Sequence, residues 1–436
     1  MTRNPARHVA SSPESVKGPA HARALRSHSV ARMLGLGLTA VLAFVAVGGA
    51  TAAVTFTGNI RSVDADKLLG DDRPEEVVPE DPNAEKPLNI VLLGSDSRGG
   101  ENSDVVDDGT DGARSDTTMI MHISSDRTRV EMLSIPRDTT VDVPSCPTSD
   151  GSETTPLYGT KFNAAFAQGV LTGGDVESGA LCVIETIEEI SDVRMNGFVV
   201  VDFAGFERMI NAIGGVELCI PEDIDAPKAD NLVLSAGVQE LDGETALKYA
   251  RARSGVKGLG DGSDLGRIGR QQELLAALAR EVLSAGTLAD PTKSLKFLNA
   301  VTSSMTMSSN FASVQGLAGL AYSARNVRPG TIAFMTAPYT YDPNNSANVL
   351  FTDEATTVWD NLKHDRPLSD AIQTETKKSK KKGSTAAEGE DSSADATPVS
   401  DDDTAAEGTT EDPEPSRTRD AGEEAFTGAD VTSVCG

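Results

Sequence analysis

Arginines recur in five short segments of this chain, four of which also contain a carboxylate, and the combination suggests phosphate chemistry. The segments contain seven arginines, although the chain as a whole is acidic, with a formal net charge of -27. Arginine forks bind phosphate oxygens in pairs and keep their charge, while carboxylates can hold a divalent ion. We therefore expect a site for a doubly charged anion beside a metal ion. The segments are GSDSR (94–98), RSDT (114–117), IPRD (135–138), YARAR (249–253) and DLGRIGRQQ (264–272).

Two aspartates are candidates for the metal site. Asp96 follows an apolar run that reads as a buried strand, and Asp116 directly precedes another such run. Ligands gather at the carboxyl edge of α/β sheets, so the two carboxylates could meet there and hold Mg²⁺, which usually takes one or two carboxylates plus phosphate oxygens. The alternative is that they are turn or cap aspartates, which are common at such positions. For each aspartate alone, that alternative is the more common case.

The arginines occupy positions that suit an anion. Arg137 follows a strand, whereas Arg251 and Arg253 lie on one side only if residues 249–253 are extended. Arg267 and Arg270 lie in the first turns of a helix that begins near Asp264, and a helix N-terminus favours phosphate. Gln271 shares the face of Arg267, one turn later. Any single arginine is more often part of a surface salt bridge, but seven in five motifs of an acidic region favour a site.

Other catalytic schemes fit the sequence poorly. There is no Gly-x-Ser-x-Gly motif of a serine hydrolase and no P-loop. His122 lies inside a predicted strand, where packing is a better explanation than catalysis. We expect no nucleic-acid partner.

Strands and helices must position these residues. Apolar runs predict strands, and apolar residues at helical spacing predict helices, the second of which stops at Gly286. Their alternation predicts a three-layer α/β/α domain. The lack of a regular βαβ rhythm before Ile135 predicts a mixed sheet. The predicted strands are 88–93, 117–123, 130–135, 198–203 and 216–220, and the predicted helices are 204–213 and 265–285.

The N-terminal part predicts a membrane anchor. Residues 1–32 are basic and read as a disordered arm, and residues 33–56 carry no charge over 24 residues, which is long enough to cross a bilayer. The positive-inside rule places the N-terminus in the cytoplasm and the rest of the chain outside. The alternative is a cleaved signal peptide with Ala50-Thr51-Ala52 as its cleavage site, which the long basic arm disfavours.

The remaining chain divides by composition. Residues 57–87 are rich in Asp, Glu and Pro and predict an extracytoplasmic linker. Residues 88–367 predict the catalytic domain, with its motifs between 88 and 286. Residues 368–436 begin with a lysine cluster and continue as an acidic low-complexity stretch, which predicts a charged disordered tail.

Four cysteines lie in the part expected outside the membrane, where thiols oxidise. Their spacing fits no zinc motif. We favour a disulfide between Cys146 and Cys182. Cys219 and Cys435 could form a second disulfide that pins the end of the tail, or they could be free thiols.

Taken together, the motifs resemble the LytR-CpsA-Psr family, membrane-anchored bacterial enzymes of cell-wall assembly. The resemblance covers residues 88–286, and the motifs occur in the family's order with similar spacing. No single motif is specific for this family, but their combination is. Besides the five segments above, the combination includes KFNAAF (161–166), FAGF (203–206), IGGV (213–216) and LDGETAL (241–247).

The resemblance implies a reaction and a fold. Members of this family take a glycopolymer linked by pyrophosphate to a polyprenyl lipid and transfer its phosphoglycosyl end to a hydroxyl group of peptidoglycan, releasing polyprenyl phosphate. Mg²⁺ is the usual ion, and Mn²⁺ could replace it. The family fold is an α/β/α sandwich with a hydrophobic groove for the lipid tail. Lipid bilayer, lipid-linked glycopolymer and peptidoglycan are the implied partners.

The resemblance also implies roles for residues. Asp96 and Asp116 are similar to the metal-binding pair of the family. Asp264 could orient an arginine or accept the proton of the attacking hydroxyl, although it also reads as a helix cap. Arg114 and Arg137 resemble catalytic members of the pyrophosphate clamp. Further clamp or motif residues are Arg98, Asn163, Arg251, Arg253, Arg267, Arg270 and Gln271. Apolar residues that could line the lipid groove, or simply belong to the core, are Phe203, Phe206, Met209, Ile210 and Leu274.

Two other functions remain compatible with the sequence. The chain could be a non-catalytic polyprenyl-pyrophosphate binder that regulates wall synthesis, or a pyrophosphatase that uses water as the acceptor. The intact acid pair and arginine set favour catalysis. No folded accessory domain is expected after Arg366, unlike in many members, and the sequence does not name the glycopolymer.

Overall fold

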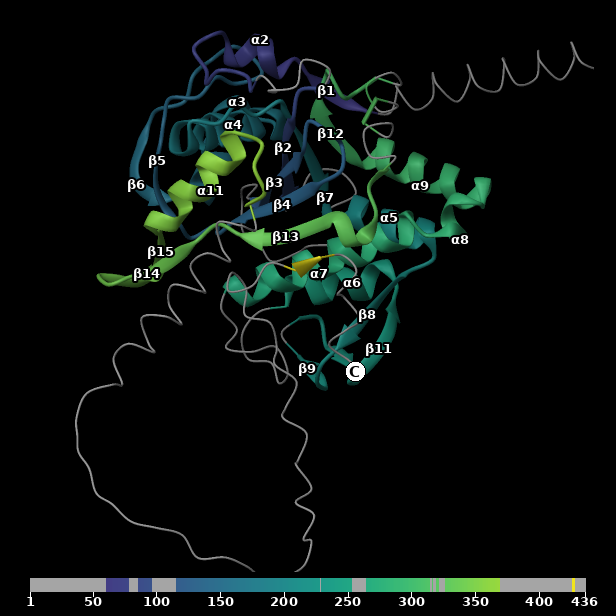
Figure 1. Cartoon of the computed structure of the whole chain (residues 1–436). Helices are drawn as coiled ribbons and strands as arrows, with labels where there is room; N and C mark the ends of the chain where they lie inside the picture. Colours follow the sequence, from purple (N-terminus) through teal and green to yellow (C-terminus); the bar gives the residue numbers. More distant parts are fainter. Residues whose placement is uncertain are drawn as a thin grey trace, which may run out of the picture. The chain divides into compact units, whose positions relative to one another are not determined.

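The structure is a computed structural model of the chain (Figure 1). It describes residues 60–77, 85–95, 115–227, 229–252, 264–313, 316, 319–320, 326–368 and 426–427. Within these residues, no helix is long and apolar enough to cross a membrane. The predicted span 33–56 lies outside them.

A mixed sheet of eight strands forms the centre of the fold, as the sequence predicted. Both parallel and antiparallel pairs occur: β2 runs parallel to β7 and antiparallel to β3. The apolar runs of the sequence fill its middle strands. In spatial order the strands are β1 (Arg61–Val63), β12 (Met305–Ser308), β7 (Gly197–Asp202), β2 (Leu88–Ser95), β3 (Ser115–Ile123), β4 (Val130–Ile135), β13 (Ile332–Thr336) and β16 (Phe426–Thr427).

Helices cover both faces of this sheet (Figure 1). Successive strand residues point to opposite faces, and on β3 the buried Ile120 packs with one helical layer while Met119 packs with the other. One layer consists of α3 (Asn163–Gly173), α4 (Val176–Ser191) and α11 (Asp353–Lys363). The other consists of α5 (Phe203–Ile213), α6 (Gly243–Arg251) and α7 (Asp264–Val282).

Aspartate side chains start several of these helices. Asp175, Asp202 and Asp242 cap α4, α5 and α6, each accepting a hydrogen bond from a backbone N–H of the first turn. Short elements surround the layers. They are α2 (Ala65–Leu69), β5 (Thr140–Val143), β6 (Leu157–Lys161), β8 (Val216–Ile220), β9 (Ile224–Ala226), β10 (Leu232–Leu234), β11 (Gly237–Leu241), α8 (Ala285–Leu288), α9 (Pro291–Ser304), η3 (Pro329–Thr331), β14 (Tyr339–Asp342) and β15 (Asn345–Phe351).

The folded part begins earlier than the sequence suggested. β1 and α2 lie inside the predicted linker 57–87, and β1 adds to the sheet beside β12. Arg73 then donates two hydrogen bonds to Glu188 of α4, at 2.6 and 2.9 Å. The linker prediction is wrong for this stretch because charged residues that look solvated in sequence find buried partners in α4.

The predicted disordered tail also contains one ordered element. Phe426 and Thr427 form β16 and pair with β13 at the edge of the sheet. The ring of Phe426 stacks on Phe334, with centroids 5.3 Å apart. The prediction for 368–436 is therefore wrong at this strand, where one buried aromatic ring anchors an otherwise acidic stretch. Apart from Leu368, the rest of the tail lies outside the described residues.

The predicted disulfide between Cys146 and Cys182 is present, and it links the loop after β5 to α4. Cys219 on β8 is also disulfide-bonded. Its predicted partner, Cys435, lies outside the described residues.

Candidate active site

The site lies at the edge where the central parallel strands end. β2, β4, β7 and β13 all run in one direction, and β3 runs in the other. Asp116 at the start of β3 therefore lies at the same edge as Arg137, which follows β4 after Pro136. This is the edge at which ligands bind in open α/β sheets.

Asp116 joins two arginines that are far apart in sequence. Its Oδ1 accepts a hydrogen bond from the Nη1 of Arg137 at 2.6 Å, and its Oδ2 accepts one from the Nη1 of Arg267 at 3.2 Å. The Arg267 side chain is only 3% exposed. Residues of the segments RSDT, IPRD and DLGRIGRQQ thus lie together in the structure. We refer to these three residues as the arginine–aspartate cluster.

An apolar pocket of about 250 Å³ adjoins the cluster. Asp116 and Arg267 form part of its wall, and Gln271 lies beside them, one turn further along α7. The rest of the wall comes from strands β2, β3, β7 and β12 and from α5, α6, α7 and α9. Its apolar residues include Leu92, Val199, Val201, Phe203, Phe206, Met209, Leu274, Leu278, Phe297 and Val301.

Four of the five residues predicted for a lipid groove line this pocket. The exception is Ile210, which is fully buried in the core between α5 and the sheet. Arg251 also lines the pocket, and its guanidinium lies 4.9 Å from the centre of the Phe203 ring, a cation–π distance. Since α6 extends through Arg251, residues 249–251 are helical rather than extended.

Arg270 and Asn163 lie outside the pocket wall. Arg270 points toward α6, where its Nη2 donates a hydrogen bond to the carbonyl oxygen of Ala252 at 2.6 Å. Burial lowers the pKa of its guanidinium below the usual value. Asn163 begins α3, and its backbone N–H donates to the carbonyl oxygen of Arg137. Asn163 therefore contacts the arginine segment through its backbone.

Several predicted site residues lie outside the described part of the chain: Asp96, Arg98, Arg114 and Arg253. Asp264 is the first residue of α7, and only its backbone is described.

The donors around Asp116 are compatible with a hard divalent ion. Gln271, whose buried Oε1 atom has no hydrogen-bond partner among the described residues, lines the pocket together with Asp116. Carboxylate and amide oxygens are ligands for Mg²⁺, which completes its shell with phosphate oxygens and water. In the described residues no group of three or more acidic, histidine or cysteine side chains is placed to hold a metal.

Two further charged residues adjoin the cluster, and the sequence reading gave them no role. Asp138 lies 3.6 Å from the Nε of Arg137, and Lys161 pairs with Asp138 at 2.7 Å. Asp138 belongs to the motif IPRD and Lys161 to the motif KFNAAF. Their place in these motifs could therefore have indicated that they lie near the site. Cations and carboxylates therefore alternate from Lys161 to Arg267.

Comparison with known proteins assigns the chain to a family. LcpB of Corynebacterium glutamicum, described as a probable cell wall biosynthesis protein, is 34% identical over 274 residues, 61% of this chain and 58% of LcpB. TagV of Bacillus subtilis, named a polyisoprenyl-teichoic acid–peptidoglycan teichoic acid transferase, is 33% identical over 208 residues, 47% of this chain and 46% of TagV. The chain thus spans about half the length of these relatives.

A solved structure described as a LytR-Csp2A-Psr enzyme from Actinomyces oris aligns with a TM-score of 0.48 and 21% identity, over 70% of this chain and 96% of that one. The pattern of the LytR_cpsA_psr family matches residues 52–364. Because this match includes most of the chain, with every strand of the central sheet except β16, both helical layers and the cluster, the chain belongs to the LytR-CpsA-Psr family.

Proposed function

We propose that this chain is a phosphotransferase that moves a glycopolymer from a polyprenyl-pyrophosphate carrier onto peptidoglycan and releases polyprenyl phosphate. The observation that carries the proposal is the arginine–aspartate cluster beside an apolar pocket. Such a pocket suits a polyprenyl chain, and adjoining guanidinium groups suit its pyrophosphate. The name of TagV, which describes transfer of teichoic acid to peptidoglycan, supports the same class of reaction.

The arginines would bind and orient the pyrophosphate. Arg137 and Arg267 are held in place by Asp116 before any substrate arrives, so little reorganisation is needed when charge develops on the phosphate oxygens. Arg251, stacked on Phe203, would contact the same group from α6. From the sequence, Arg98, Arg114 and Arg253 would complete the clamp.

The reaction is a displacement at phosphorus. The oxygen of a peptidoglycan hydroxyl forms a bond to the phosphorus that carries the sugar, and the bond from this phosphorus to the oxygen of polyprenyl phosphate breaks. The leaving phosphate takes the electron pair, and the arginines stabilise its charge. The hydroxyl proton passes to a carboxylate, for which Asp264 is our candidate. Mg²⁺ or Mn²⁺, when bound, neutralises phosphate charge, and Asp116 and Asp96 would hold it.

We further propose that residues 33–56 anchor the chain in the membrane as a single span. The basic residues before this segment support a cytoplasmic N-terminus and an extracytoplasmic domain. The domain would then share a compartment with peptidoglycan and act on lipid carriers in the outer leaflet.

Arginine variants test the proposed site. Full-length protein is assayed with a lipid-pyrophosphate donor, peptidoglycan oligomers and Mg²⁺. We expect Arg137→Ala and Arg267→Ala each to reduce kcat/KM about 100-fold or more, as for loss of a donor to a developing oxyanion. Arg280→Ala is the matched control, because Arg280 lies at the other end of α7 and bonds Glu217. Transfer by Arg137→Ala at the parental rate would refute the assignment.

A further inference from the structure

Gln272 makes a set of buried hydrogen bonds that the proposed chemistry does not use. It follows Gln271 on α7 and is 3% exposed. Its Nε2 lies 2.8 Å from the Oγ of Ser134, 2.9 Å from the carbonyl oxygen of Met335 and 3.3 Å from the Oγ1 of Thr336. One amide therefore connects α7 to two strands of the central sheet.

Those partners lie at the strand ends next to the cluster. Ser134 is on β4, three residues before Arg137. Thr336 is the last residue of β13 and pairs with Ser134 in the register of the two strands. The carbonyl oxygen of Ser134 also accepts the N–H of Ala337 at 2.9 Å. Gln272 thus binds the ends of β4 and β13, next to the segment that carries Arg137 into the site.

The cluster depends on the distance between α7 and β4. One oxygen of Asp116 meets Arg137 from the sheet side, and the other meets Arg267 from α7. A shift of the helix along its axis, or a rotation about it, would move Arg267 away from the position set by Asp116. Apolar contacts of Leu274 and Ala277 hold α7 on the sheet, but such contacts are non-directional.

An amide at this buried position costs free energy unless its polar groups are hydrogen-bonded, so packing alone does not explain why it is there. A buried amide must satisfy its donors, whereas an apolar side chain of similar shape needs no partner. Directed hydrogen bonds to fixed strand ends specify both the rotation and the axial position of a helix. Because Arg267 and Gln271 precede Gln272 on the same helix, they are positioned by the same bonds.

We propose that Gln272 is a positioning residue, which locks α7 to the ends of β4 and β13 so that Arg267 and Gln271 meet the pyrophosphate opposite Arg137. The proposal rests on the proposed function in that it assumes a pyrophosphate ligand. It adds a residue that touches neither the pocket nor the ligand.

The test replaces Gln272 by methionine, which has similar shape and no N–H. Affinity for inorganic pyrophosphate with Mg²⁺ is measured by calorimetry, and transfer is measured in parallel. We expect pyrophosphate affinity to fall at least about 10-fold and kcat to fall about 10- to 100-fold, the loss typical of a misplaced group. The KM for the lipid donor should change less than about threefold, because the apolar pocket supplies most of its binding.

A control separates positioning from lost stability. Ile184→Val removes a methylene from the core on the opposite face of the sheet and costs roughly 1 kcal/mol of stability. It should leave both readouts unchanged. Ser134→Ala is the milder second variant, for use if Gln272→Met does not fold, and it should change both readouts in the same direction by a smaller factor.

The outcomes are distinct. If Gln272→Met, or Ser134→Ala in its place, keeps parental pyrophosphate affinity and kcat, the positioning role is overturned. If Ile184→Val loses activity in proportion to its loss of stability, the activity lost by Gln272→Met is explained by stability alone, and the proposal also fails. If the parent transfers nothing, the proposed function fails, while the pyrophosphate affinities still decide the role of Gln272.

Discussion

At the scale of single residues, the site depends on one carboxylate shared by two guanidinium groups. The side chains of Asp116 and Arg137 are 19% and 17% exposed, and that of Arg267 is only 3% exposed. Charge-assisted hydrogen bonds of this kind are short and directional. An incoming pyrophosphate would compete with Asp116 for the same N–H groups. The cluster is therefore suited to hold its arginines ready for an anion.

The sequence could predict which residue types form the cluster, but it could not predict where every side chain of the motif points. Arg267 and Gln271 share a helical face, so their joint approach to the pocket followed from spacing alone. Arg270 belongs to the same motif, yet it binds Ala252 at the end of α6. Which face of a buried helix meets the ligand depends on the elements packed around it, and local spacing does not contain that information.

Glu185 on α4 allows a prediction away from the site. Burial raises the pKa of Glu185 to about 7, and the nearby charge of Glu188 adds to the effect. Within the part of the chain that the structure describes, its buried Oε2 has no hydrogen-bond partner. Because the folded-state pKa lies above the unfolded one, stability falls as pH rises from about 4.5 to about 7 and stays lower above that.

We therefore expect Glu185→Gln to stabilise the protein at pH 8 and to leave its stability nearly unchanged at pH 4. Since Glu185 is partly exposed, screening limits the gain, to roughly 1–2 °C in Tm for a domain of this size. Thermal unfolding at both pH values is the measurement. Glu222→Gln, at an exposed carboxylate that does not contribute to the pKa shift of Glu185, is the control. An equal rise in Tm at both pH values would contradict the explanation by ionisation.

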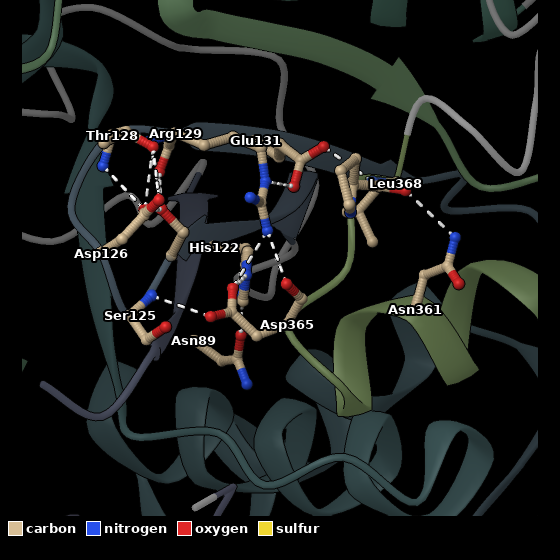
Figure 2. A network of polar contacts seen from close by, with 12 residues as sticks. Asn89, His122, Ser125, Asp126, Thr128, Arg129, Glu131, Asn361, Asp365 and Leu368 are labelled. Atoms are coloured by element: carbon tan, nitrogen blue, oxygen red, sulfur yellow. Dashed lines mark hydrogen bonds and ion pairs between the residues drawn. The ribbon is translucent and has the colours of Figure 1, made fainter. Parts of the chain in front are cut away.

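At the scale of elements, a polar clamp fixes the chain after α11 to the β3–β4 hairpin (Figure 2). Asp365 accepts hydrogen bonds from the backbone N–H of Ser125 and from Arg129, and it contacts the Nε2 of the buried His122 at 3.0 Å. Glu131 accepts the N–H of Leu368 at 2.7 Å. The clamp therefore holds the residues that follow α11 against the β3–β4 hairpin.

Acid should weaken this clamp. Burial alone would raise the pKa of Asp365, but the hydrogen bonds of His122 and Ser125 outweigh it and lower the pKa to about 2. A depressed folded-state pKa contributes stability above the unfolded value, and this contribution is lost as pH falls from about 4 to about 2. Asp365→Asn should cost on the order of 1–3 kcal/mol at pH 7.

Urea unfolding at pH 7 and pH 3 measures this effect, and the difference between parent and Asp365→Asn should narrow at the lower pH. Asparagine tolerates the positive φ of 52° at this position, so the change removes the charge and one acceptor oxygen without straining the backbone. Asp360→Asn, at a half-exposed carboxylate, should have little effect at either pH. A constant difference between the two pH values would argue against ionisation of Asp365.

Long apolar elements were predictable, and short edge elements were not. The apolar runs at 88–93 and 130–135 correspond to β2 and β4. A buried strand can be predicted from its own residues, because they form a continuous apolar run. The helix predicted for 265–285 ends earlier, at Val282, and α8 follows. β1 and β16 lie in charged segments. They are strands because each pairs with an edge of the sheet formed by residues far away in sequence, β12 and β13 respectively.

At the scale of the whole molecule, the chain before the predicted catalytic domain and the end of the tail both take part in the sheet. β1 and β16 occupy its two edges. Open edges invite pairing with other chains, so these short strands protect the sheet with segments that composition alone would assign to linkers. The membrane anchor remains a prediction from residues 33–56.

The central claim is that the molecule transfers a phosphoglycosyl group and does not merely bind or hydrolyse the donor. The most direct measurement follows the phosphorus that carries the sugar. Full-length protein in bilayer discs receives a donor with radioactive phosphorus at that atom, together with peptidoglycan oligomers and Mg²⁺. We predict that the label enters peptidoglycan as a phosphodiester while an equal amount of polyprenyl phosphate is released. Label found only in free glycan phosphate, or retained in unreacted bound donor, would contradict the claim.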